Sequence, residues 1–163
     1  MTLAAADWSV RRLAVGDDAL YAGMLDCFAE AFDDAASYSS RRPRPTYVAQ
    51  LLANDGFVAL AAVVGTDVVG ALAAYELPKF EQERSEFYLY DLAVRASYRR
   101  RGVARALIER LREIAAQRGG WVVFVQADTD EDDGPAIALY ESIGTREEVL
   151  HFDIPVRVDA SSA

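Results

Sequence analysis

Two apolar segments separated by three turn-forming residues constrain the fold of this 163-residue chain more than any other feature. Residues 57–64 and 68–75 are rich in valine and alanine, and together they approach the length of a membrane span. The Gly65-Thr66-Asp67 interruption leaves each half well short of the roughly 20 residues that a transmembrane helix needs. A turn between two β-prone segments instead predicts a β-hairpin.

Hydrophobic periodicity predicts further elements on both sides of this hairpin. We expect one domain over residues 1–155 and a polar tail over 156–163, because the chain is short and no linker interrupts it. The other predicted strands are 8–15, 86–94, 121–126 and 145–154. The predicted helices are 19–32, 47–53, 99–119 and 133–143, with a loop over 33–45. This order indicates an α+β fold, in which parallel crossovers follow an antiparallel meander in one mixed sheet.

Charge is unevenly distributed along the chain. Seventeen basic residues stand against 26 acidic ones, for a net charge of −9. Residues 95–118 hold eight arginines and two acids, whereas the rest holds nine basic and 24 acidic groups. A positive segment on a negative body favours two ligands of opposite charge, although solvated helices also carry arginines without any ligand. The acidic remainder argues against a nucleic-acid partner and against an anionic membrane.

Metal-binding and disulfide-forming residues are scarce. Cys27 is the single cysteine and His151 the single histidine, so we expect no internal disulfide and no Cys/His zinc site. The first seven residues lack the basic region and the apolar core of a signal peptide. Both observations favour a reducing, cytoplasmic location.

A basic, glycine-containing turn joins the predicted strand 86–94 to the helix that follows. Its sequence is Arg99-Arg100-Arg101-Gly102-Val103-Ala104. At the start of a helix, the free N–H groups of the first turn point toward a bound anion, and the helix dipole favours negative charge there. Glycine lets the backbone approach the ligand closely, and the arginines add positive charge. The turn therefore predicts an anion site, although it is neither a P-loop nor G-x-G-x-x-G.

The same turn resembles the acyl-CoA motif Gln/Arg-x-x-Gly-x-Gly/Ala of the GCN5-related N-acetyltransferases, and it follows the string DLAV at 91–94. Residues 136–144, AIALYESIG, are similar to that family's A-x-x-L/F-Y-x-x-x-G segment. Longer strings, such as VVFVQADTDEDDGPAIALYESIG over 122–144, resemble the aminoglycoside 3-N-acetyltransferases of the gentamicin-modifying type. The closer resemblance extends over about residues 86–154.

The resemblance implies an acetyl-CoA-dependent enzyme with the GCN5-related N-acetyltransferase fold, a central mixed sheet flanked by helices. It implies acetyl transfer to the 3-amino group of the deoxystreptamine ring of gentamicin-type antibiotics, hence resistance, and a homodimer. Backbone groups of the 92–94 strand end would hold pantetheine, and the 100–105 amides would take the pyrophosphate. The cofactor-binding residues expected on this basis are Leu92, Ala93, Val94, Arg99, Arg100, Arg101, Gly102, Val103, Ala104, Arg105, Asp133, Ala136 and Tyr140.

Two residues are predicted to be catalytic. Acetyl transfer to a protonated amine needs a carboxylate that attracts the cation and helps to remove its proton. Asp91 stands inside an aromatic strand, an unusual position for aspartate, with Phe87, Leu89 and Ala93 on its nominal face. The alternative is an edge-strand or bulge aspartate that faces water. Tyr140 matches the family tyrosine that protonates the departing thiolate, and its alternative is a packed core tyrosine.

Asp133 stands where the family often has asparagine. It could cap the following helix, but it would hydrogen-bond pantetheine differently. It also ends a group of five acids in six positions, which begins at Asp128 after the strand 121–126. Such a group is usually a solvated loop. Here the strand end is expected to open at the active cleft, and the implied substrate is a polycation. We therefore expect Asp128 and Asp130 to bind substrate.

His151 and Asp153 form a further candidate pair. Strand alternation places both on one face with Val149, which allows a substrate contact or a base relay. A lone histidine in a strand is more often structural.

Other functions remain open. The same chemistry on a polyamine, a peptide N-terminus or a small metabolite fits the acidic residues equally well. A non-catalytic acyl-CoA-binding module on the same fold is a second alternative. Nucleic-acid binding through the arginines is a third, and the acidic remainder disfavours it.

Overall fold

The structure is a computed structural model that describes residues 7–129 and 133–156. It divides into two compact units, residues 1–126 and 127–163. Each unit is described by itself, and the single domain expected over residues 1–155 stays a prediction. Of the sequence-predicted site residues, Asp130 lies outside the described part of the chain.

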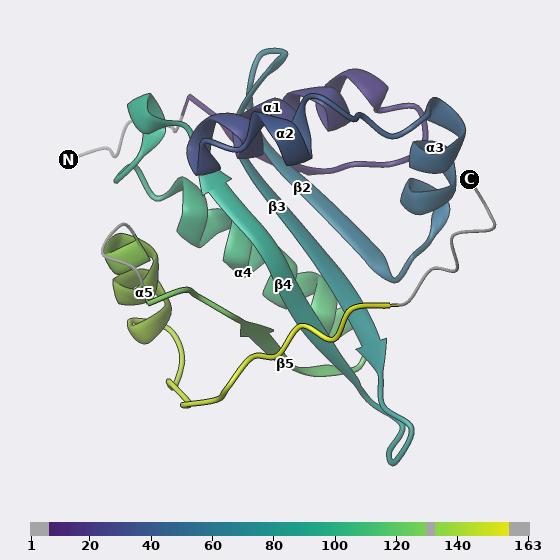
Figure 1. The fold of residues 1–163 in the computed structure, drawn as a ribbon, viewed down its shortest axis with the longest axis vertical. Helices are drawn as coiled ribbons and strands as arrows, with labels where there is room; N and C mark the ends of the chain where they lie inside the picture. The colour runs from purple at the N-terminus through teal and green to yellow at the C-terminus, as the bar shows by residue number, and fades with distance from the viewer. Residues whose placement is uncertain (1–6, 130–132, 157–163) are drawn as a thin grey trace. The chain divides into compact units, whose positions relative to one another are not determined.

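The first unit is built on a five-stranded mixed sheet in the order β1-β2-β3-β4-β5 (Figure 1). Neighbours are antiparallel from β1 to β4, and β4 pairs with β5 in parallel. The expected hairpin is formed by β2 and β3. The predicted α+β class, with a mixed sheet flanked by helices, is confirmed. The strands are β1 (Ser9–Arg12), β2 (Phe57–Val64), β3 (Asp67–Pro78), β4 (Ser85–Val94) and β5 (Gly120–Val125).

Helices cover both faces of this sheet (Figure 1). One face packs against α1 (Asp18–Phe32) and α3 (Pro45–Ala53), with Met24, Cys27 and Phe28 fully buried between the layers. On the other face, α4 (Val103–Gln117) packs so closely that a Cβ added at Gly70 would lie 2.6 Å from Cγ1 of Val103. Within residues 7–129 and 133–156, no helix combines the length and the apolar character that crossing a bilayer requires.

Two connections of this unit differ from the prediction. The helix expected over 99–119 begins only at Val103, because Arg100 (φ 58°) and Gly102 (φ 82°) adopt left-handed conformations that a helix cannot continue through. A separate 3-10 turn, η1 (Ala96–Tyr98), precedes them. The expected loop over 33–45 contains a short helix, α2 (Ala35–Tyr38). The Asp34 carboxylate starts it by accepting a hydrogen bond from the backbone N–H of Ser37 at 3.0 Å.

The second unit is described over residues 127–129 and 133–156. Its helix α5 (Gly134–Glu141) has Pro135 in the first turn, which confirms that start signal. The strand predicted over 145–154 is wrong, because no residue from 145 to 156 forms a strand. Its apolar side chains are 70–87% exposed: Val149, Leu150, Phe152 and Ile154. An apolar pattern forms a strand only where a neighbouring backbone supplies ladder hydrogen bonds, and the described part of this unit holds no strand.

Candidate active site

A β-bulge at Tyr90 determines which way Asp91 points. Leu89 pairs with Ala74 of β3, whereas Asp91 pairs with Ala73, so Tyr90 is the extra residue between them. Ala73 and Ala74 are consecutive and face opposite sides of the sheet. Asp91 therefore does not share the face of Phe87 and Leu89, as the alternation of β4 predicted. It lies on the face that packs against α1.

Asp91 accepts a hydrogen bond from the hydroxyl of Tyr38 at 2.7 Å. Tyr38 ends α2 and is held by aromatic packing, with ring centroids 5.5 Å from Phe28 and 5.7 Å from Phe32. Burial raises the pKa of Asp91, and the hydrogen bond from Tyr38 opposes that rise. The sequence left open an edge-strand or bulge aspartate that faces water. Asp91 does follow a bulge, but it is half-buried and hydrogen-bonded.

Sequence reasoning did not identify Tyr38, because it lies in a segment assigned to a loop. The signal available was Asp34 three residues before Ser37, an N-cap pattern that predicts a helical turn there. That turn is what brings a tyrosine hydroxyl to a strand 53 residues further along the chain.

Beyond the bulge, β4 separates from β5. The β4–β5 pairing ends at Leu89 and Val125, whereas β4 remains paired with β3 as far as Val94 and Gly70. The backbone of residues 91–94 therefore extends past the end of its parallel neighbour. An extended chain that carries amide groups could hydrogen-bond such a strand edge. Leu92 and Val94 pair with Leu72 and Gly70 of β3, and their side chains face α4. Ala93 lies on the other face, together with Asp91.

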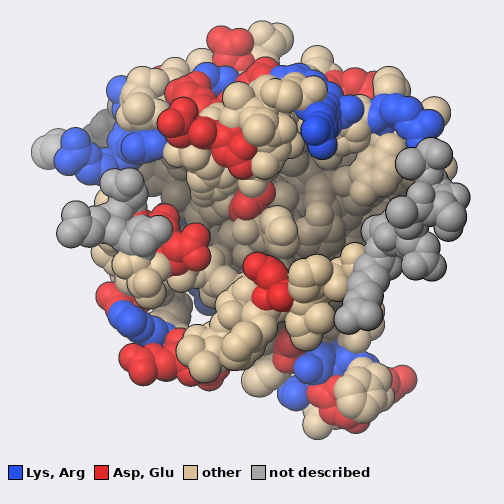
Figure 2. Space-filling model, viewed as in Figure 1, with Lys and Arg blue, Asp and Glu red and all other residues tan. Residues whose placement is uncertain are grey.

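The arginine-rich turn lies between this strand end and α4. Arg99 donates from Nε to the carbonyl of Val94 at 3.1 Å, and the Arg101 guanidinium lies 5.1 Å from the ring centroid of Tyr98. Arg99, Arg100 and Arg101 are exposed. Basic side chains gather at the upper left of Figure 2, where this turn lies in Figure 1.

The start of α4 suits a diphosphate. Gly102 occupies the N-cap and makes no side-chain cap hydrogen bond to the first turn of the helix. The N–H groups of this turn, which include those of Val103 and Ala104, lie at the start of α4. The helix dipole adds partial positive charge to them. A β-strand edge for amides followed by a basic helix N-terminus fits the pantetheine and diphosphate of acyl-CoA.

The remaining sequence-predicted residues belong to the second unit. Asp133 occupies the N-cap of α5 but makes no side-chain capping hydrogen bond. Ala136 and Tyr140 lie on α5 and are partly buried, and Asp128 is exposed. His151 and Asp153 do meet, with 3.1 Å between Nε2 and Oδ1, and both are exposed. The pair was predicted from side-chain alternation in a strand over 145–154. The two side chains meet although that strand does not form.

Comparison with protein families gives one family model over most of the chain. The acetyltransferase (GNAT) family matches residues 18–145. An aminoglycoside acetyltransferase from an uncultured soil metagenomic sample is 57% identical, with a TM-score of 0.90 over 92% of this chain and 99% of that one. A second soil metagenomic aminoglycoside acetyltransferase, solved in complex with sisomicin, is 27% identical, with a TM-score of 0.82 over 92% and 97% of the two chains.

A curated relative is named for a different substrate. The [ribosomal protein bS18]-alanine N-acetyltransferase of Escherichia coli (strain K12) is 33% identical over 81 residues. That match covers 50% of this chain and 52% of the relative, so the chain spans about half the length of the curated relative that it matches.

Proposed function

This chain belongs to the acetyltransferase (GNAT) family, and we propose that it transfers acetyl from acetyl-CoA to the 3-amino group of the deoxystreptamine ring of gentamicin-type aminoglycosides. Acetylation removes a positive charge from the drug and would thereby give resistance. The observation that carries the proposal is the Asp91 carboxylate, half-buried beside the strand end and hydrogen-bonded by Tyr38. Two similar structures of aminoglycoside acetyltransferases support the choice of acceptor.

The residues of this chain would divide the chemistry among them. Acetyl-CoA supplies the acyl group as a thioester. Asp91 attracts the protonated amine and accepts its proton, directly or through water, which leaves a neutral nucleophile. Backbone groups of residues 92–94 orient the pantetheine, and those of residues 100–105 bind the diphosphate under the charge of the arginines. The Tyr140 hydroxyl returns a proton to the departing thiolate.

Acidic residues of the second unit would recruit the polycation. Asp128 and Asp130 follow β5 in the sequence, and Asp153 pairs with His151. Asp128 and Asp153 are exposed, and exposed carboxylates add little affinity one by one. Several of them would raise the local concentration of a cationic substrate and fix its rings.

The test is thiol release from acetyl-CoA by the purified protein with gentamicin, kanamycin, spermidine, an N-terminal alanine peptide or no acceptor. Turnover with gentamicin, with NMR of the product showing acetyl on the 3-amino group, is the expected result. Turnover with the peptide alone would instead support the activity of the Escherichia coli relative. Turnover with spermidine alone would keep the cofactor and discard the drug as acceptor.

A further inference from the structure

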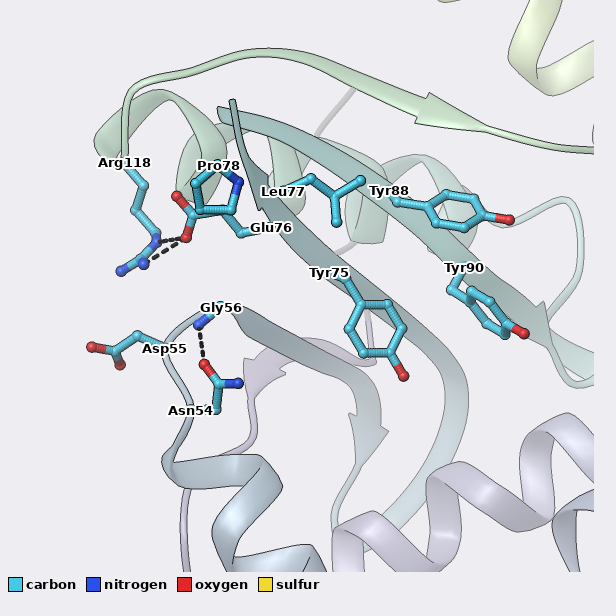
Figure 3. A pocket seen from close by; sticks show the side chains of 10 residues that line it. All are labelled: Asn54, Asp55, Gly56, Tyr75, Glu76, Leu77, Pro78, Tyr88, Tyr90 and Arg118. Carbon is cyan, nitrogen blue, oxygen red and sulfur yellow. Dashed lines mark hydrogen bonds and ion pairs between the residues drawn. The ribbon is translucent and has the colours of Figure 1, made fainter. Parts of the chain in front are cut away.

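A cleft of about 720 Å³ lies where β2 begins, beside the part of β3 that extends past Phe57 and pairs with β4. We propose that this cleft, called the tyrosine cleft below, binds a second ring of the acceptor, so that the enzyme selects multi-ring aminosugars over linear polyamines and isolated rings. This inference rests on the proposed function. The walls come from residues 54–56, from residues 75–78, and from Tyr88, Tyr90 and Arg118 (Figure 3).

Three tyrosines give the cleft a stiff aromatic wall. The ring of Tyr90 meets those of Tyr75 and Tyr88 edge-on, at centroid distances of 5.7 and 5.4 Å. Each outer ring has its own support, since Tyr75 packs on Phe57 at 5.3 Å and Tyr88 stacks on Phe124 at 4.8 Å. Rings that are fixed in advance lose little conformational entropy when a ligand covers them.

The wall is nevertheless accessible. Tyr75 is 38% and Tyr90 57% exposed, and Figure 3 shows both rings projecting from their strands beside the cleft. Exposed aromatic faces attract the C–H faces of a ligand, and they attract ammonium groups through their quadrupole. An aminosugar presents both kinds of group on one ring. A linear polyamine presents charge without a ring face.

The bulge places this wall beside the candidate base. Tyr75 pairs with Tyr88, and Asp91 pairs with Ala73, which lies two residues before Tyr75 in β3, so all three side chains lie on the same face. Because the bulge matches three residues of β4 to two of β3, Tyr88 and Asp91 are separated by roughly 7 Å of strand. An acceptor whose amine reaches Asp91 must therefore extend beyond its reacting ring to cover the wall.

One acid of the cleft, Glu76, already has charged and polar partners within the protein. Glu76, one of its lining acids, accepts from the Ser85 hydroxyl at 2.8 Å and forms an ion pair with Arg118 at 2.6 Å. Its side chain is 8% exposed. The cleft therefore recognises ring faces more than it recognises the number of charges.

Tyr90→Ala tests the proposal, with Phe80→Ala as the matched control, because Phe80 is also an exposed aromatic but does not line the cleft. We expect Tyr90→Ala to raise KM for gentamicin roughly tenfold, as the loss of a ring contact would. KM for isolated 2-deoxystreptamine and for spermidine should stay unchanged, and so should every value in Phe80→Ala. Tyr90→Phe keeps the ring and should behave as wild type, which separates ring contact from misfolding.

Equal changes of KM for gentamicin and for 2-deoxystreptamine, or no change for either, would overturn the proposal. Calorimetric binding of gentamicin to the wild type and to Tyr90→Ala separates the two claims. Tight binding that Tyr90→Ala weakens, without turnover, would keep the tyrosine cleft and refute the proposed function. Turnover of gentamicin by the wild type, with binding that Tyr90→Ala leaves unaltered, would support the proposed function and refute the role of the tyrosine cleft.

Discussion

At the scale of single residues, the hydrogen bond from Tyr38 favours the charged form of Asp91. The Tyr38 hydroxyl donates to the carboxylate, stabilises the charged form and so opposes the rise in the pKa of Asp91 that burial causes. A general base acts only when deprotonated. Activity should therefore fall as the pH drops through the pKa of Asp91.

We predict that Tyr38→Phe moves the acidic limb of the kcat/KM profile to higher pH, because the removed hydrogen bond no longer lowers the pKa of Asp91. The loss should be about fivefold at acidic pH, equivalent to about 1 kcal/mol, and small at alkaline pH. Tyr98→Phe is the control, since Tyr98 contacts Arg101 instead. A uniform loss at every pH would show that Tyr38 only supports the fold.

Asp91→Asn separates activity from stability. We predict a loss of kcat between about 10²- and 10⁴-fold, as expected for removal of a general base. We also predict a gain in stability at pH 7. Because the folded-state pKa is raised, the aspartate is most favourable when protonated, and its ionisation destabilises the fold as pH rises. Thermal unfolding should show this gain vanish towards pH 4, near the ordinary pKa of aspartate.

At the scale of elements, the start of α4 depends on a glycine for its conformation. Gly102 has φ 82°, and an added Cβ would meet no atom within 4 Å, so alanine would be strained without a steric clash. We predict that Gly102→Ala raises KM for acetyl-CoA several-fold and costs about 1 kcal/mol of stability. Gly16→Ala is the matched control, with φ 99° and equally open space. A rise in KM in both variants would mean that general destabilisation is responsible.

Elements with strong periodicity were predictable, and interruptions of that periodicity were not. The buried face of α4, with Val103, Leu107 and Leu111, follows helical spacing and was found from the sequence. The bulge at Tyr90 adds one residue to β4 and reverses its alternation, and nothing in the local sequence marks that position. Asp91 was therefore assigned to the face of Phe87 and Leu89, which is wrong, while its catalytic role stays a prediction. The segment 145–154 shows the opposite failure, a strand-like pattern without a paired neighbour.

Charge acts at the scale of the whole molecule. The net charge of −9 attracts a cationic acceptor from a distance, while the arginine-rich turn offers the anionic cofactor a separate positive surface. The two proposed ligands thus approach through fields of opposite sign. Salt weakens both fields, because the Debye length shrinks from about 10 Å at 0.1 M to about 3 Å at 1 M.

We predict that kcat/KM for gentamicin falls roughly tenfold between low salt and 0.5 M salt, because screening removes long-range attraction of the polycation. The measurement is steady-state kinetics at saturating acetyl-CoA, so that weaker cofactor binding does not contribute. The matched control is isolated 2-deoxystreptamine, which carries fewer ammonium groups and should show a shallower dependence. A second control uses sucrose to match the viscosity of the 0.5 M salt solution without adding ions. It should leave kcat/KM for both acceptors nearly unchanged. Identical salt slopes for the two acceptors would contradict charge attraction and leave ring contacts in the tyrosine cleft as the basis of selectivity.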